Sequence, residues 1–146
     1  HTPADNCVTD YLQKLFDESK PYYVSDIVKI LKDIPEYMAS MSEVGLAPQV
    51  VTGSEKRRAG KVFVDMTGGT GGSKKAFEKL SNAGVGTIVG MHISDEHRKE
   101  ADKYHMNVVI AAHIPSDNLG MNLLLDNALD NVEVVETSGF RRIART

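Results

Sequence analysis

The sequence has little cysteine and no long run of apolar residues. Cys7 is the single cysteine among 146 residues. One cysteine cannot form an internal disulfide framework or a zinc site built from several thiolates, and it fits a reducing compartment, so we expect a cytoplasmic protein. No apolar run approaches the roughly 18 residues of a membrane-spanning helix, so we expect no membrane span.

A strong charge of one sign is also missing. The net charge is −3, with 41% hydrophobic and 25% charged residues, which is the composition of one ordinary globular domain. Basic residues form two clusters, namely Lys56, Arg57, Arg58 and Lys61, and Arg141, Arg142 and Arg145. Because an acidic balance is a poor footprint for a nucleic-acid binder, we interpret both clusters as solvent-facing and expect no nucleic-acid partner.

A short pattern, His-x-Pro-x-Asp-Asn, occurs twice in the chain. It spans residues 1–6 and 113–118, and an amphipathic helix is predicted after each copy. So short a match can arise by chance. The shared context, a helix after each copy, suggests two related elements that serve one site.

The first 48 residues are predicted to be mainly helical. Helices are expected over residues 4–17 and from Ser25 to Pro35, followed by a connector over 36–48 with one helical turn. Because the sequence begins at His1 rather than methionine, we expect a fragment whose preceding strand lies upstream. The prediction is a helical segment, 1–48, that completes an upstream α/β half, and a carboxy-terminal α/β domain, 49–146.

From residue 61 onward, strands and helices are predicted to alternate as βαβαβαβ, after a short β-rich run at 49–52. Strands are expected at 61–66, 87–91, 108–112 and 132–136, and helices at 73–83, 94–104 and 116–129. Strands that alternate with helices of about a dozen residues favour a largely parallel sheet with right-handed crossovers. The predicted fold class is therefore α/β, with helices on the faces of the sheet.

Titratable side chains follow the predicted strands. A histidine precedes a carboxylate by four residues at three places: His1 and Asp5, His92 and Glu96, and His113 and Asp117. Ligands of open α/β sheets gather beyond the carboxyl ends of the strands, and imidazole with carboxylate suits zinc, manganese or iron. The alternative is that the histidines are ordinary surface residues and the carboxylates are helix caps or partners of the helix dipole.

A glycine-rich stretch follows the strand at 61–66 and opens a predicted helix. It consists of Thr67, Gly68, Gly69, Thr70, Gly71, Gly72 and Ser73. Backbone amides without Cβ crowding at a helix N-terminus can bind an anion, although the Walker spacing and the dinucleotide fingerprint are both absent. A bound anion would offset the unfavourable position of Lys74 and Lys75 in the first helical turn. A tight turn with solvent-facing lysines remains the alternative.

Three motifs together carry a family resemblance. They are Asp65-Met66-Thr67-Gly68-Gly69-Thr70-Gly71-Gly72-Ser73, then Gly84-Val85-Gly86-Thr87-Ile88-Val89-Gly90-Met91-His92, then Ala111-Ala112-His113 with Asp117 four residues later. In this combination the chain resembles the Ngg-interacting-factor-three-like family, also called type-two GTP cyclohydrolase I homologues. The resemblance is to the carboxy-terminal half of the family and is strongest over residues 61–126.

The resemblance implies a metal site. Family members bind two divalent metals between two similar α/β halves, using a His-His pair, an Asp and a His-x-x-x-Glu. Asp5, His113 and Asp117 fit this set, although Asp117 stands where the family usually has the longer Glu. The His-His pair is absent from these residues, so the resemblance places it upstream and implies that a fragment would hold an incomplete or metal-free site.

Further implications concern neighbouring residues and partners. By the resemblance, His1 would stand behind the ligands, and His92 with Glu96 would line the cleft. Family members assemble into hexameric rings, which implies a homo-oligomer.

Three functions remain open from the sequence. The leading hypothesis is a dimetal-dependent hydrolase that acts on an anionic substrate, such as a nucleotide or another phosphoester. The second is a non-enzymatic, oligomeric interaction protein with a structural or vestigial metal site. The third is a phosphate- or nucleotide-binding module built only on residues 67–73.

Overall fold

The computed structural model of the chain describes residues 2–67, 73–129 and 132–145. In chain order, the elements are α1 (Thr2–Ser19), α2 (Val24–Lys32), α3 (Pro35–Val44), β1 (Gln49–Thr52), β2 (Lys61–Asp65), α4 (Lys75–Asn82), β3 (Val85–Gly90), α5 (Asp95–Lys103), β4 (Asn107–Ile110) and α6 (His113–Ala128).

The strands form one sheet in the order β1-β4-β3-β2. β2 pairs with β3 and β3 pairs with β4 in parallel, while β1 joins the outer edge of β4 antiparallel. The predicted α/β class and the largely parallel sheet are therefore confirmed. The two parallel pairs place the ends of β2, β3 and β4 along one edge, where ligands of such sheets usually bind.

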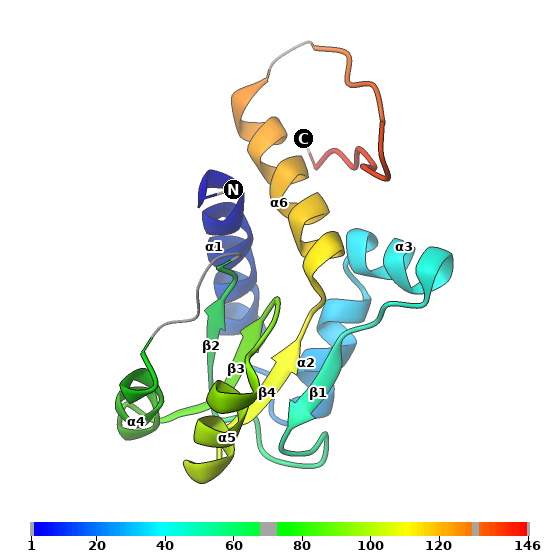
Figure 1. Cartoon of the computed structure of the whole chain (residues 1–146). Helices are drawn as coiled ribbons and strands as arrows, with labels where there is room; N and C mark the ends of the chain where they lie inside the picture. The colour runs from blue at the N-terminus through cyan, green and yellow to red at the C-terminus, as the bar shows by residue number, and fades with distance from the viewer. Residues whose placement is uncertain (1, 68–72, 130–131, 146) are drawn as a thin grey trace.

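α1 and α2 cover one face of the sheet (Figure 1). Their apolar stripes, including Val8, Leu12 and Ile27, are buried in one core with Val64 and Val109 of the strands. The period of the stripes matches a helix with one buried face, which is why the first helix was predictable from sequence. The proposed boundary at residue 48 stays a prediction, although these helices and the sheet share a core.

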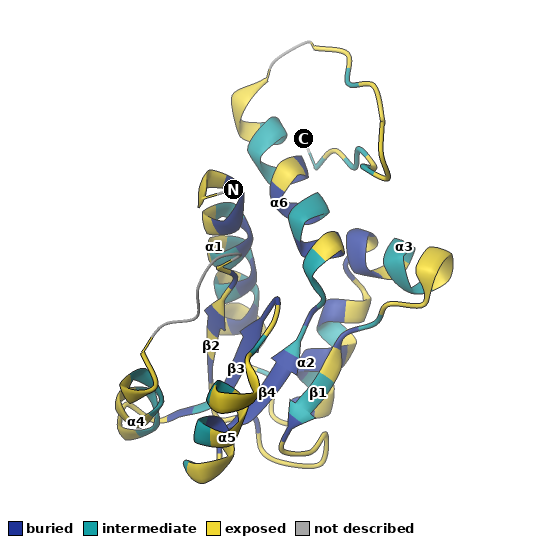
Figure 2. Cartoon of the chain, viewed as in Figure 1, coloured by how far each residue is buried: buried dark blue, intermediate teal, exposed yellow. Residues whose placement is uncertain are grey.

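α4 and α5 lie on the opposite face of the sheet, where the packing is looser (Figure 1). Ile88 and Val108 are buried there, and Phe77 and Leu80 of α4 are only partly buried against them. Figure 2 shows the contrast between the buried strands and α4, which has no buried residue. This face therefore leaves space between the sheet and its helices.

The predicted connector over 36–48 is wrong, because residues Pro35–Val44 form the helix α3. Pro35 is in the first turn, where its missing N–H costs nothing, and Gly45 ends the helix with a left-handed φ of 71°. The apolar period is weak because α3 buries Glu36 beside Tyr37 rather than a stripe of aliphatic residues.

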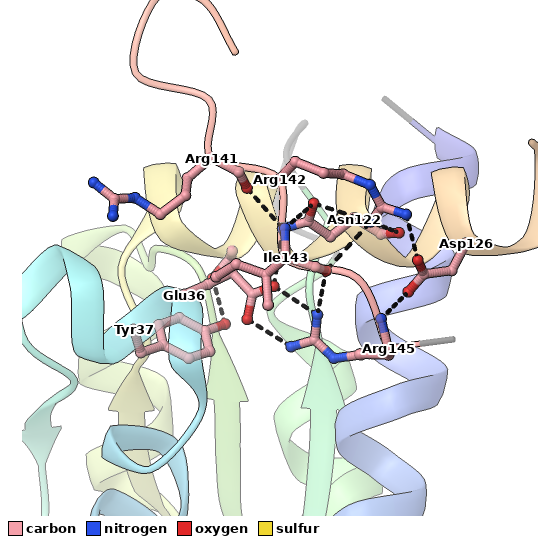
Figure 3. Close-up of polar contacts among 9 residues, drawn as sticks. Glu36, Tyr37, Asn122, Asp126, Arg141, Arg142, Ile143 and Arg145 are labelled. Atoms are coloured by element: carbon pink, nitrogen blue, oxygen red, sulfur yellow. Dashed lines mark hydrogen bonds and ion pairs between the residues drawn. The ribbon is translucent and has the colours of Figure 1, made fainter. Parts of the chain in front are cut away.

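The predicted strand at 132–136 is also wrong, because these residues pair with no strand. Further along the chain, the carboxy-terminal segment, residues 141–145, lies against α6, and its Arg142 and Arg145 bond to the protein rather than face solvent (Figure 3). Arg142 donates to Asp126 at 2.5 Å, and Arg145 donates to both carboxylate oxygens of Glu36 at 2.7 and 2.6 Å. The arginines thus hold the carboxy-terminal segment on α6 and α3.

None of the helices in the described part of the chain is long and apolar enough to cross a membrane.

Candidate functional site

The first turn of α6 carries the histidine and the carboxylate that the sequence singled out. His113 Nε2 lies 3.3 Å from Asp117 Oδ2, and both side chains are about 40% exposed, at 41% and 38%. The structure therefore brings this predicted pair together. It does so on one face of a helix, one turn apart, rather than across a strand-to-helix turn, because α6 begins at His113 instead of Ser116.

The backbone before His113 is strained. Ala112 joins β4 to α6 with a φ of 73°, a conformation that is uncommon for a residue with a Cβ. Such strain costs about 1–3 kcal/mol and is held in place by surrounding contacts, often at functional sites. Ser116 supplies one of these contacts, because its Oγ donates to the Ala112 carbonyl at 2.5 Å.

Tyr37 of α3 fastens this turn to the core. Its hydroxyl lies 2.7 Å from Ser116 Oγ, and it must be the donor because the Ser116 proton goes to Ala112. Burial raises the pKa of Tyr37, which keeps the hydroxyl protonated. Sequence reasoning missed Tyr37 and its contact with Ser116, since that contact links positions 79 residues apart.

Asp5 reaches the same region from the first turn of α1. α1 and α6 pack closely at Gly120, where an added Cβ would lie 2.8 Å from the Ala4 carbonyl oxygen. The pKa of Asp117 is raised by burial, lowered in part by His113, and raised further by the charge of Asp5. The two carboxylates are therefore near enough to repel each other, which a bound cation would relieve.

His92, after β3, also joins the group. Its ring centroid lies 5.7 Å from that of His113, so two imidazoles stand at the ends of adjacent parallel strands. Glu96 does not join them, because its carboxylate lies 3.1 Å from Lys74 Nζ. From the sequence, we suggested that a bound anion would offset the charge of Lys74. In the structure, the Glu96 carboxylate takes that role.

The remaining predicted residues are only partly described. His1 and Gly68, Gly69, Thr70, Gly71 and Gly72 lie outside the described residues. At the two ends of the glycine-rich stretch, Thr67 Oγ1 donates to Asp65 at 2.9 Å, and Ser73 Oγ accepts the Lys75 N–H at 3.2 Å.

A cavity of about 530 Å³ lies between the sheet, α4 and α5, and His92 stands on its wall. Its apolar lining includes Phe63, Phe77 and Ile110, while Thr67, Ser73 and Ser94 add hydroxyls. His97 of α5 also lines it. No sequence signal pointed to Phe77 and His97, because the cavity results from the way α4 and α5 pack.

Comparisons with known proteins match the fold and not the sequence. No family model and no curated protein matches the chain. Among solved structures, a NIF3 superfamily protein from Sphaerobacter thermophilus superposes over 84% of this chain with a TM-score of 0.64 and 22% identity. The fold is NIF3-like.

The NIF3-like fold confirms the predicted resemblance at the level of the fold. The chain spans 44% of the length of the Sphaerobacter protein, so less than half of that structure is compared. A second solved structure, reduced HcgD from Methanocaldococcus jannaschii, matches 63% of this chain and 37% of its own, with a TM-score of 0.44 and 18% identity.

The donor set of this NIF3-like chain suits a metal, but its side chains do not enclose one. Within residues 2–67, 73–129 and 132–145, no group of three or more His, Cys, Asp or Glu side chains is placed to hold a metal ion. Asp5, His113 and Asp117 share a neighbourhood, yet His113 and Asp117 are turned toward each other. A metal would require these side chains to rotate away from their mutual contact.

Replacing Asp117 with asparagine should stabilise the metal-free protein slightly at neutral pH. Because folding raises the pKa of Asp117, its stabilising contribution is present below the unfolded pKa and is lost as pH rises through the folded pKa. Asparagine cannot ionise and so avoids this loss. Thermal unfolding with a chelator should show a higher Tm for Asp117→Asn at pH 7, and no difference at about pH 3.

Asp10→Asn is the control, because Asp10 is an exposed acid on α1 and the variant has the same net charge. It should leave Tm nearly unchanged at both pH values. A lower Tm for Asp117→Asn at pH 7 would show that the contact with His113 outweighs burial and the repulsion by Asp5.

Proposed function

We propose that this chain binds a divalent cation through Asp5, His113 and Asp117, and that it acts as part of a metal-dependent hydrolase on an anionic substrate. One observation carries the proposal. His113 and Asp117 lie together in the first turn of α6, and the charge of Asp5, in the first turn of α1, adds to the raised pKa of Asp117. A cation is the partner that this arrangement of charges favours.

The types of ligand residue limit which cation is expected to bind. Neutral imidazole and carboxylate oxygen, without thiolate, suit zinc, manganese or iron. A bound divalent cation would supply Lewis acidity and lower the pKa of a bound water. The short arm of Asp117 and the partial set of donors favour additional ligands from outside these residues, and the family resemblance implies a His-His pair for that role and a second metal.

The protein's own groups would position the reaction. The contacts of Tyr37 and Ser116 hold the backbone of the turn that carries His113 and Asp117, while the two side chains would rotate to bind the cation. His92 is exposed beside His113, so its imidazole lies next to the proposed metal site. A homo-oligomeric assembly, which the resemblance also implies, is proposed as the form in which the site works.

Equilibrium dialysis followed by elemental analysis tests the proposal. The chain is dialysed against zinc or manganese, and we expect bound metal that is lost in His113→Ala and in Asp117→Asn. Hydrolysis of a panel of nucleotides and phosphoesters should need the metal and disappear in the same two variants. Circular dichroism should show that both variants remain folded.

His105→Asn is the matched control. It also removes one imidazole, at an exposed position, and asparagine tolerates the φ of 56° at residue 105 better than alanine would. It should bind as much metal as the unmodified chain. If the chain binds no metal, or if His113→Ala and Asp117→Asn bind as much as His105→Asn, the metal site is disproved and the non-enzymatic interaction protein becomes the better hypothesis.

A further inference from the structure

The cavity beside His92 has the size and the lining of a small-molecule site. Its volume of about 530 Å³ falls in the range of roughly 300–1,000 Å³ that is usual for such pockets. The sheet supplies Phe63, Ile88, Val108 and Ile110 as an apolar floor. Ligand sites commonly combine such a floor with a few polar groups, which here are hydroxyls and imidazoles near the strand ends.

Two aromatic side chains form part of the wall. The rings of Phe77 on α4 and His97 on α5 have centroids 5.4 Å apart and planes tilted by 48°. Both rings line the cavity. A flat ring that enters the cavity would meet the apolar floor on one side and could contact these two rings on the other. An aliphatic chain would fill the space without using the aromatic contacts.

The cavity and the candidate metal site are joined by one residue. His92 lines the cavity, and its ring stands 5.7 Å from the ring of His113. A ligand could therefore place its ring over Phe63 in the cavity. A polar substituent on that ring that extends past His92 would then lie near His113. The charged groups on the lining are Lys79 and Asp65, and Asp65 already accepts hydrogen bonds from Thr67.

From these contacts we infer that the substrate of the proposed site carries a heteroaromatic ring, which binds in the cavity between the sheet, α4 and α5, while its acidic group lies beside His92 and His113. The inference rests on the proposed function and narrows its substrate class. Among anionic substrates, we expect those with a heteroaromatic ring, such as a nucleobase, to bind better than simple phosphoesters. Ring nitrogens and exocyclic groups would pair with the hydroxyls of Thr67, Ser73 and Ser94.

Tryptophan fluorescence can report occupancy of the cavity, because the chain contains no tryptophan of its own. Phe63→Trp places the reporter on β2, at a position that lines the cavity and is 38% exposed. Adenosine 5′-monophosphate and uridine 5′-monophosphate are titrated into the chelator-treated variant, beside ribose 5-phosphate. We expect at least one nucleotide to quench the fluorescence saturably, and to bind at least tenfold more tightly than ribose 5-phosphate.

A second substitution shows where the ring binds. Ala76→Phe, added to Phe63→Trp, fills the cavity and should weaken nucleotide binding at least tenfold. Ala83→Phe makes the same change at an exposed position after α4 and should leave binding unchanged. The inference is overturned if neither nucleotide binds more tightly than ribose 5-phosphate, or if both phenylalanine variants have the same affinity.

The two proposals fail separately. If metal binding follows His113 and Asp117 but the nucleotides are not preferred, the hydrolase proposal stands and the ring-bearing substrate is excluded. If the nucleotides bind in the cavity but the chain takes up no metal, the ring site stands and the proposed hydrolase falls.

Discussion

Replacing Arg145 with methionine is expected to lower the free energy of unfolding by about 3–5 kcal/mol, since removing one partner of a buried ion pair leaves an uncompensated charge. The side chain of Glu36 is fully buried, and Arg145 donates to both of its oxygens (Figure 3). In the variant, the carboxylate would keep the hydrogen bond that Asn122 Nδ2 donates to it at 3.0 Å. Urea unfolding followed by circular dichroism measures the loss.

Arg141→Met is the matched control for this prediction. Arg141 also belongs to the carboxy-terminal segment, and its guanidinium pairs with Glu43, but both of these side chains are 51% exposed. Exposed ion pairs contribute about 0–1 kcal/mol, so this variant should stay within that range of the unmodified protein. Equal losses for Arg141→Met and Arg145→Met would contradict the role given to the buried pair.

A double variant separates the charge from the packing. Glu36→Met together with Arg145→Met replaces the pair by apolar side chains, which is often neutral or stabilising. Asn122 would keep the Arg141 carbonyl as an acceptor, at 3.0 Å. The double variant should therefore be more stable than Arg145→Met alone. If it is less stable, the segment is held by the guanidinium's other contacts, such as the one with the Tyr11 ring.

The sequence predicted those helices and strands whose buried residues form a regular apolar pattern within a short stretch of the chain. The helix that became α1 shows a regular apolar stripe, and β4 contains the apolar run Val108, Val109 and Ile110, of which Val108 and Val109 are buried. Turn residues and helix caps then separated the elements well enough to reveal the alternation of strands and helices. These features need no knowledge of distant parts of the chain.

The errors share a non-local cause. α3 was missed because its buried face contains Glu36, whose partner Arg145 lies 109 residues away. The run at 132–136 has β-forming residues, but strand formation depends on a neighbouring strand, and the segment pairs with none. The arginines near the end of the chain look like solvent-facing residues until α3 and α6 are brought beside them.

In the candidate site too, contacts within one helix were predictable from the sequence and contacts between distant elements were not. Four-residue spacing correctly placed His113 beside Asp117, because both lie on one turn of a helix. The same spacing did not pair Glu96 with His92, since the Glu96 carboxylate pairs with Lys74, the residue before α4. The cavity with Phe77 and His97 depends on how two helices sit on the sheet, and no spacing along the sequence encodes that.

Replacing Gly120 with alanine is expected to destabilise the protein by about 1–3 kcal/mol, although alanine normally favours a helix over glycine by about 1 kcal/mol. The reason is the close approach of α1 and α6. The new Cβ would lie 2.8 Å from the Ala4 carbonyl oxygen and 2.9 Å from Val8 Cγ2. Gly120→Val should cost more than Gly120→Ala. Chemical unfolding gives both values.

Met121 provides the reference for this experiment, because it is the next residue on α6 and is 40% exposed. Comparing Met121→Gly with Met121→Ala measures how much alanine gains over glycine where nothing crowds the Cβ, and we expect the usual sign. The opposite sign at Gly120 would then be due to the contact with α1. If alanine stabilises both positions, the close packing of the two helices is disproved.

A second substitution is expected to restore little of the stability lost in Gly120→Ala, because the closest contact is with backbone. Val8→Ala removes the Cγ2 that crowds residue 120, but the nearest atom belongs to the Ala4 backbone and cannot be trimmed by substitution. The Val8→Ala and Gly120→Ala changes together should therefore recover little stability. Because Ala4 precedes Asp5, a helix pushed away at Gly120 would carry that carboxylate away from Asp117. Gly120→Ala should thus weaken the proposed metal binding as well as stability, whereas Met121→Ala should affect neither.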